Sequence, residues 1–297
     1  MTDIASERWT GAIPEKRTPG GPFRLGGEAH KQLFCRTLLE THNPYKPAVI
    51  DWPKLEPDAL HRVKSLPIWD IAVQTEGRAG QNVKAYAQLV AADDWLRKAV
   101  ELNAFEESRH KQVLANLVEA YGVTLEPEPP YKAPRDPEWA FMVTGFSECI
   151  DSFFAFGLFD LARRSGFFPT ALVDTFEPVI HEEARHILFF VNWAAWRRRN
   201  LTWWKRPWFE LRVMAVWLFL AWERVGIARG LDAAPASDAN FTLTGAGQVG
   251  LDVSLRQLID ICLSENDRRL APYDARLLRP RFVPAMARLA RRFTKDA

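Results

Sequence analysis

The sequence predicts an all-α protein built on a four-helix bundle, and three observations carry this prediction. Long segments with helical periodicity are bounded by Pro, Asp and Gly residues, which start and end helices. A phrase of the form Glu-Glu-x-Arg-His occurs twice, at 106–110 and 182–186. No alternating strand pattern and no P-loop appears. We expect one domain, with an arm at 1–66, a bundle at 67–199 and a C-terminal helical extension at 200–297.

The expected helices follow in order, and most have a start or stop signal. Pro67 precedes the first long helix, where a missing N–H costs little, and Gly122 ends the second. A Pro-rich stretch at 126–137 is the crossover to the third helix, which ends near Gly166, and Pro169 opens the fourth. The expected segments are 27–41, 68–89, 94–121, 137–164, 169–199, 207–229, 247–269 and 282–293.

Composition narrows the class of protein. Of the 297 residues, 47% are hydrophobic and 26% charged, as in ordinary soluble globular proteins. A net charge of +2 is too small to indicate nucleic-acid binding by the whole surface. Cys35, Cys149 and Cys262 are far apart and form no CxxC, which favours free thiols in a reducing compartment.

Targeting signals are not evident in the sequence. The first ten residues carry Asp3 and Glu7 and no apolar run, unlike a signal peptide. The longest apolar stretch, Val213 to Trp222, is too short to span a bilayer. We therefore expect a cytoplasmic protein.

Each copy of the repeated phrase places a carboxylate and an imidazole on one helix face. Glu107 and His110 are three residues apart, as are Glu183 and His186, and three residues advance a side chain by about 300° around a helix. The spacing therefore puts both side chains of each pair within about 60° of one another.

Two further glutamates match these pairs in height. Glu76 lies about as far before the turn near residue 91 as Glu107 lies after it, and Glu148 and Glu183 are related in the same way about Gly166. In antiparallel hairpins such residues meet. The predicted metal ligands are Glu76, Glu107, His110, Glu148, Glu183 and His186.

The chemistry of this ligand set favours iron or manganese. Carboxylate and imidazole ligands suit both metals, and the absence of thiolates argues against a structural zinc site. Two divalent ions a few ångströms apart would also explain four buried glutamates, because unpaired buried carboxylates are very costly.

The order Glu, Glu-x-x-His, Glu, Glu-x-x-His over residues 67–199 resembles the ferritin-like di-iron carboxylate superfamily. The resemblance implies a ferritin-like four-helix bundle with a dinuclear centre, either two Fe ions or Mn/Fe, that activates O2 or peroxide. The chain contains no dinucleotide-binding βαβ unit and no Fe–S cysteine spacing. Electrons are therefore expected from an external donor, such as a reductase or a ferredoxin-like protein.

The full phrase is similar to the Asp-Glu-x-Arg-His repeats of bacterial multicomponent monooxygenases. In those enzymes the leading acid orients a metal-bound histidine and the arginine pairs with that acid. By resemblance, Glu106 and Glu182 would each bond the imidazole of the opposite motif, with Arg109 and Arg185 as charge partners. The alternative is that these residues form solvated pairs on the helix exterior.

Ser152 follows Glu148 by one helical turn and resembles the proton-relay threonine of the same enzymes. The alternative is a buried serine that bonds the carbonyl four residues before it. Gly145 lies on this face, and its small size is expected to leave room for O2 or substrate. Phe141 and Phe159 are expected to make that pocket apolar.

Residues 193–222 form a second unusual region. Seven of the twelve tryptophans fall here, interleaved with Arg197, Arg198, Arg199, Lys205 and Arg206. Trp beside Lys and Arg is typical of a segment at a membrane surface. Packing against the outside of the bundle, or a homodimer face, is the alternative that stays open.

The leading functional hypothesis is an O2-activating oxygenase or oxidase that acts on a small apolar organic substrate. A ferroxidase or other iron-handling protein, a peroxide-reducing protein and a metal-free helical scaffold are the alternatives. Storage ferritins need little beyond the bundle, whereas this chain has long segments on both sides of it.

Overall fold

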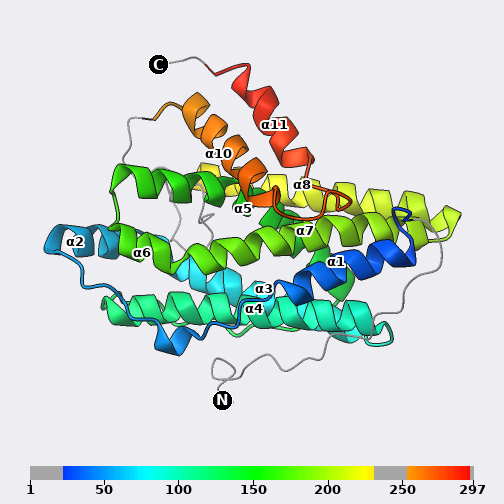
Figure 1. Cartoon of the computed structure of the whole chain (residues 1–297), viewed down its shortest axis with the longest axis horizontal. Coiled ribbons are helices and arrows are strands. Elements are labelled where there is room, and N and C mark those ends of the chain that lie inside the picture. Colours follow the sequence, from blue (N-terminus) through cyan, green and yellow to red (C-terminus); the bar gives the residue numbers. More distant parts are fainter. Residues whose placement is uncertain (1–22, 231–252, 295–297) are drawn as a thin grey trace.

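A computed structural model of the chain describes residues 23–230 and 253–294. Within this part, all regular structure is helical, as the sequence predicts (Figure 1). Four long helices carry the predicted ligands: α3 (Trp69–Leu89), α4 (Asp94–Ala120), α5 (Pro137–Ser165) and α7 (Glu177–Asn200). Helix α3 packs against α4 and α5, and α7 packs against α5 and α4.

Local signals account for the ends of these helices. The side chain of Asp93 accepts a hydrogen bond from the Leu96 N–H at the start of α4, and Asp136 caps α5 through the Trp139 N–H. Helix α5 ends at Gly166, whose φ of 65° is left-handed. The boundaries of α3, α4 and α5 agree with the prediction to within about one residue.

The predicted fourth helix is interrupted, which corrects the sequence analysis. It divides at Phe176 into a short helix, α6 (Thr170–Thr175), and α7. Pro178 lies in the first turn of α7. Because proline has no N–H, a continuous helix would lose the bond from residue 178 to the carbonyl of Asp174.

The arm contains a helix that the sequence analysis missed. Helix α2 (Pro57–Ser65) begins with a proline at its first position. Its buried Ala59 and Val63 are four residues apart and pack with Leu117 of α4. The four-residue spacing of these two side chains is visible in the sequence, but the prolines around them did not suggest a helix.

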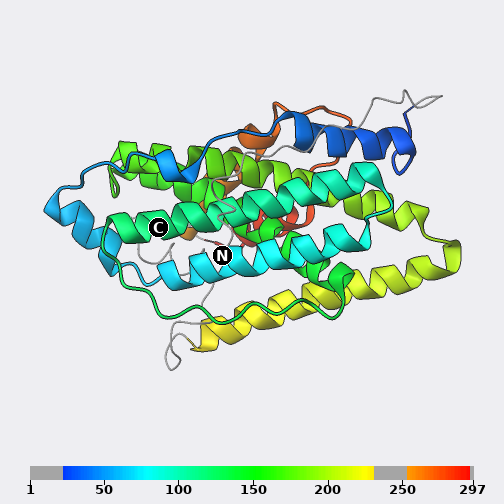
Figure 2. The same ribbon diagram turned by 90° about the horizontal axis from the view of Figure 1, so that it is seen from below.

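The remaining helices pack around the four long ones. Helix α1 (Glu28–Glu40) lies against α4 and α7, and the 3-10 turn η2 (Pro47–Val49) lies against α4. Helix α8 (Arg206–Gly230) packs on α5, α10 (Leu255–Leu270) on α5 and α7, and α11 (Phe282–Arg291) on α10 and α5. Figure 2 shows α8 along one edge of the molecule.

Helix α10 begins later than the predicted segment 247–269. Ser254 and Gln257 form a reciprocal capping box, so α10 starts at Leu255. Residues 247–252 of the predicted segment lie outside the described residues. A Gly-x-Gly-x-x-Gly run at 245–250 lies there too, and it corrects the expectation that the sequence has no such run.

One described helix, α5, is long and apolar enough to cross a membrane by length and composition. Half of its most apolar window is buried, and α3, α7, α8, α10 and α11 all pack on it. Its composition is therefore accounted for by packing inside the protein.

Two apolar clusters occupy opposite ends of the long helices. One contains Tyr86 near the end of α3 and Trp95 near the start of α4. The other contains Trp69 at the start of α3 and Leu117 near the end of α4. The predicted ligands of α3 and α4 lie between these clusters in sequence, so both helices bring them to the middle of their length.

Candidate metal centre

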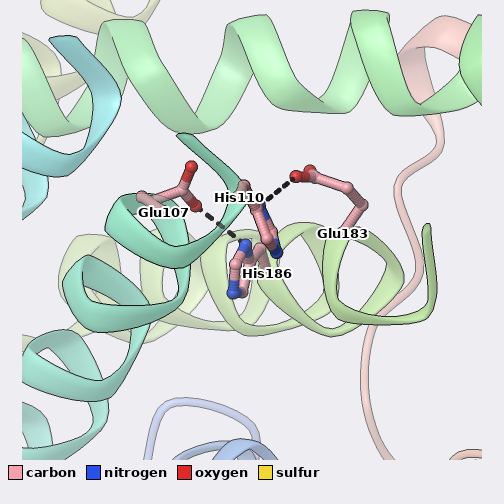
Figure 3. Close-up of side chains that lie close together, drawn as sticks. All are labelled: Glu107, His110, Glu183 and His186. Carbon is pink, nitrogen blue, oxygen red and sulfur yellow. Dashed lines mark ion pairs between the residues drawn. The ribbon is translucent and has the colours of Figure 1, made fainter. Parts of the chain in front are cut away.

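The two repeated motifs lie on α4 and α7, and their side chains face each other (Figure 3). One ligand atom from each of Glu107, His110, Glu183 and His186 lies within 4.8 Å of the others. His110 Nδ1 is 3.1 Å from Glu183 Oε1, and His186 Nδ1 is 2.8 Å from Glu107 Oε1. Each histidine therefore approaches the carboxylate of the opposite motif.

The other two predicted ligands belong to the same environment. Glu76 Oε2 of α3 lies 3.7 Å from His110 Nδ1. Burial raises the pKa of Glu148 of α5 well above its usual range, and repulsion from Glu107 and Glu183 raises it further. Of the six predicted ligands, the four on α4 and α7 form the convergent group, and Glu76 and Glu148 from α3 and α5 lie close enough to interact with it.

Three buried atoms of this cluster make no hydrogen bond of ordinary geometry to the described residues. They are Nδ1 of His110, Nδ1 of His186 and Oε1 of Glu148. The two imidazole nitrogens nevertheless lie at ion-pair distance from Glu183 and Glu107. All three atoms are ligand atoms of the kind that iron and manganese bind, so the donor set fits a metal centre.

Glu106 and Glu182 orient the two imidazoles in a crossed arrangement. His110 Nε2 lies 2.9 Å from Glu182 Oε2, and His186 Nε2 lies 2.8 Å from Glu106 Oε2. Because a carboxylate only accepts, each Nε2 carries the proton and each Nδ1 faces the cluster. Both glutamates are fully buried, so the alternative of solvated exterior pairs is wrong.

Two buried arginines neutralise these glutamates, also in a crossed arrangement. Arg185 Nη1 is 3.0 Å from Glu106 Oε1, and Arg109 Nη2 makes a short contact with Glu182 Oε1. Although burial opposes it, attraction to Arg185, with the hydrogen bond to His186, holds the pKa of Glu106 well below its usual range. Glu106 therefore acts as a charged acceptor.

The segment 38–45 supplies contacts that the sequence analysis missed. His42 Nδ1 lies 2.7 Å from Glu106 Oε1, and the Tyr45 hydroxyl donates to Glu182 Oε2 over 3.4 Å. His42, Glu106 and Glu182 also bring their ligand atoms within 4.8 Å of one another. Arg109 and Arg185 already compensate this second group, so we assign it no metal.

The same segment satisfies the two arginines. Arg109 Nη1 donates to the carbonyls of Asn43 and Tyr45 at 2.7 and 3.1 Å. Arg185 donates to Thr41 Oγ1 at 2.8 Å and to a carbonyl of α1. Local sequence patterns do not predict these contacts. Residues 41–45 lie outside the helices, and the two arginines are more than 60 residues away in sequence.

Neutral donors orient two of the predicted ligands. Asn103 Nδ2 donates to Glu107 Oε1 over 3.0 Å, a contact that the sequence analysis missed. Ser152 Oγ donates to Glu183 Oε2 over 3.2 Å. The serine hydroxyl is therefore directed at a ligand, where its role as a proton relay stays a prediction.

The open pocket expected beside Gly145 is not present. The ring of Phe190 occupies the space that a Cβ at Gly145 would take. Phe141 stacks on Tyr86 with ring centroids 4.3 Å apart and is part of the core. Phe159 lies beneath the guanidinium groups of arginines. These aromatic rings fill space by packing on other elements, which the helix-face pattern alone did not show.

Helices α3 and α4 approach each other closely at Gly80, beside the cluster. A Cβ at Gly80 would lie 3.3 Å from Ser108 Oγ, which is tight, and 3.5 Å from Glu107 Cβ, which is ordinary contact. The glycine that weakens the helix in isolation thus has a packing reason here.

Protons compensate the charges of the metal-free cluster. Burial raises the pKa of Glu76 to about 8, with Glu107 and Glu183 adding to the effect and His110 opposing it. The surrounding carboxylates overcome burial and hold the pKa of His110 and of His186 well above the usual range. A bound cation would displace these protons.

Comparison with known proteins gives no family assignment. No protein-family model, no curated protein and no solved structure matches the chain. Function must therefore be argued from the site.

Proposed function

We propose that the protein is an O2-activating oxygenase or oxidase with a dinuclear iron or Mn/Fe centre on a ferritin-like four-helix bundle. The observation that supports this most is the convergence of one ligand atom from each of Glu107, His110, Glu183 and His186, the four residues of both Glu-x-x-His motifs. Paired motifs of this kind on facing helices are the ligand pattern of di-iron carboxylate proteins. The metal ligands would be Glu76, Glu107, His110, Glu148, Glu183 and His186.

The bound metals would supply reduction of O2, and the chain's own residues would hold and orient them. Glu106 and Glu182 fix the imidazoles with Nδ1 inward. Asn103 and Ser152 fix one oxygen each of Glu107 and Glu183. Such supporting hydrogen bonds set ligand basicity and geometry.

The cluster is open to solvent on one side. The side chains of Glu76 and Glu183 are 21% and 14% exposed, whereas those of Glu107 and the two histidines are 2% or less. The route for O2 and a small apolar substrate would lie on the Glu76 and Glu183 side. Since the described cysteines are buried free thiols, electrons would come from an external donor.

The metal assignment is tested by elemental analysis of purified protein. We expect iron, or iron with manganese, in the unmodified protein and almost none in the Glu107→Ala/Glu183→Ala variant. A matched control, Glu101→Ala/Glu119→Ala, removes two glutamates on the solvent side of α4 and should keep its metal. Equal metal content in both variants would contradict the site.

The reaction class is tested by O2 consumption. Protein loaded with ferrous iron and supplied with a chemical reductant should consume O2 faster when a small apolar substrate is added, with an oxidised organic product. The iron-handling alternative predicts instead a large multisubunit shell that mineralises many irons per chain. That outcome would contradict the oxygenase proposal while leaving the metal site intact.

A further inference from the structure

Helix α8 is apolar on two faces, only one of which packs against the protein. Phe209, Val216 and Leu220 are buried on the inner face. The outer face carries exposed side chains at spacings of three and four residues, which form one stripe along the helix. They are Trp208, Leu211, Met214, Leu218 and Trp222, and exposed Trp204 lies just before the helix begins.

The tryptophans of the predicted 193–222 region separate into two groups. Trp193 is fully buried in the core, so the region does not act as one surface. Trp203, Trp204, Trp208 and Trp222 are between 60% and 75% exposed. Exposed tryptophans therefore lie at the start of α8 and again at Trp222, with exposed Leu and Met side chains between them.

A groove extends the apolar face toward α11. Its volume is about 720 Å³, and its walls include Leu211, Met214, Trp217 and Phe282. The rings of Trp217 and Phe282 are 4.3 Å apart. Helix α11 starts at Phe282 and exposes further apolar side chains one turn apart, which are Met286, Leu289 and Phe293.

Cations border this face. Exposed Arg199, Lys205 and Arg206 lie near the start of α8, whereas the neighbouring Arg198 is paired with Glu210. Helix α11 and its ends carry exposed Arg281, Arg288 and Arg292 and contain no carboxylate. We define the exposed stripe of α8, the groove and the exposed residues of α11 as the α8/α11 face.

We propose that the α8/α11 face docks the protein on an anionic phospholipid surface. Exposed tryptophans with flanking Lys and Arg are suited to the headgroup boundary, and the cations complement anionic lipids. A second copy fits less well, because it would present the same cations. Among the described side chains of α8, the carboxylates Glu210 and Glu223 are already paired with Arg198 and Arg224.

Cosedimentation of the full chain with phosphatidylcholine vesicles that contain phosphatidylserine tests this. We expect binding that weakens with added salt and falls by about tenfold or more in Trp208→Glu/Trp222→Glu, because the change removes two exposed indoles and adds two negative charges. The control Val49→Glu/Leu89→Glu changes two exposed apolar residues elsewhere and should bind as the unmodified protein does.

Three outcomes would overturn the proposal. They are absence of vesicle binding, equal loss in both variants, and a dimer in solution that Trp208→Glu/Trp222→Glu dissociates without vesicle binding. The last would assign the face to a second copy. Circular dichroism checks that each variant is folded. Because the assay uses metal-free and metal-loaded protein alike, its result is independent of the proposed oxygenase function.

Discussion

The interior of the four long helices and the outer face of α8 depart from the usual distribution of side chains in opposite ways. The interior buries carboxylates, imidazoles and two arginines, whereas α8 exposes tryptophans. Buried charge is costly unless it is compensated, and large apolar surface is costly when it is exposed. The two proposals follow from this difference, a cation that compensates the buried carboxylates and an anionic lipid surface that covers the exposed tryptophans.

The largest effect should come from breaking the compensation of buried charge. Glu106→Gln leaves the fully buried guanidinium of Arg185 without its carboxylate, so we expect a loss of about 3–5 kcal/mol in the free energy of unfolding. Glu101→Gln removes an exposed pair with Arg97 and should cost less than about 1 kcal/mol. Urea unfolding of both variants measures the difference, and similar losses would contradict the role of Arg185.

The second-largest effect should be that metal binding changes how the free energy of unfolding depends on pH. In metal-free protein the pKa of Glu76 is raised to about 8 and that of Glu148 is raised too. Folded protein therefore holds protons that the unfolded chain releases, and stability should fall as pH rises from about 5 to 8. The raised pKa of His110 and of His186 acts in the same direction above about pH 6.5.

Melting temperatures measured across this range, with and without iron, test the prediction. Bound iron displaces the protons, so the metal-loaded protein should melt higher and with a weaker dependence on pH. Glu106 and Glu183 have a lowered pKa and affect stability only in more acidic solution. A metal-free melting temperature that rises from pH 5 to 8 would count against the protonated cluster.

A smaller effect is expected from the segment 38–45. His42→Ala removes a hydrogen bond to Glu106, and His42 is two contacts away from the proposed metal. We expect metal affinity to fall by about tenfold. The matched control is His61→Ala, an exposed histidine of α2. Competition with a chelator measures both affinities. Unchanged affinity in His42→Ala would limit the segment to a structural role.

The smallest effect should come from the exposed face. Trp222→Ala should change the free energy of unfolding by less than about 0.5 kcal/mol, because the indole is mostly in solvent. Metal content should stay the same. A loss of metal or of several kcal/mol in this variant would show that the face supports the interior, and the two regions would no longer be separable.

Sequence patterns predicted the parts of the site that depend on helical periodicity. The positions of Glu107, His110, Glu183 and His186 on facing helices follow from spacing and from the signals that end each helix. The crossed bonds of Glu106 and Glu182 were expected only from resemblance, since spacing alone does not reveal which side of a helix is buried.

Helical periodicity does not predict contacts from irregular segments. His42 and Tyr45 reach the site from a segment without periodicity, and their partners are fixed by tertiary packing. Phe190 fills the space beside Gly145 for the same reason. The break at Phe176 could be predicted, because Pro178 is visible in the sequence.

Anomalous scattering from crystals of iron-loaded protein tests the central claim most directly. Data collected at the iron and manganese edges should show two adjacent metal peaks between α4 and α7, within bonding distance of His110 Nδ1 and His186 Nδ1. Peaks that lie elsewhere, or the absence of any metal at these two nitrogens, would contradict the claim that the repeated motifs form a metal centre.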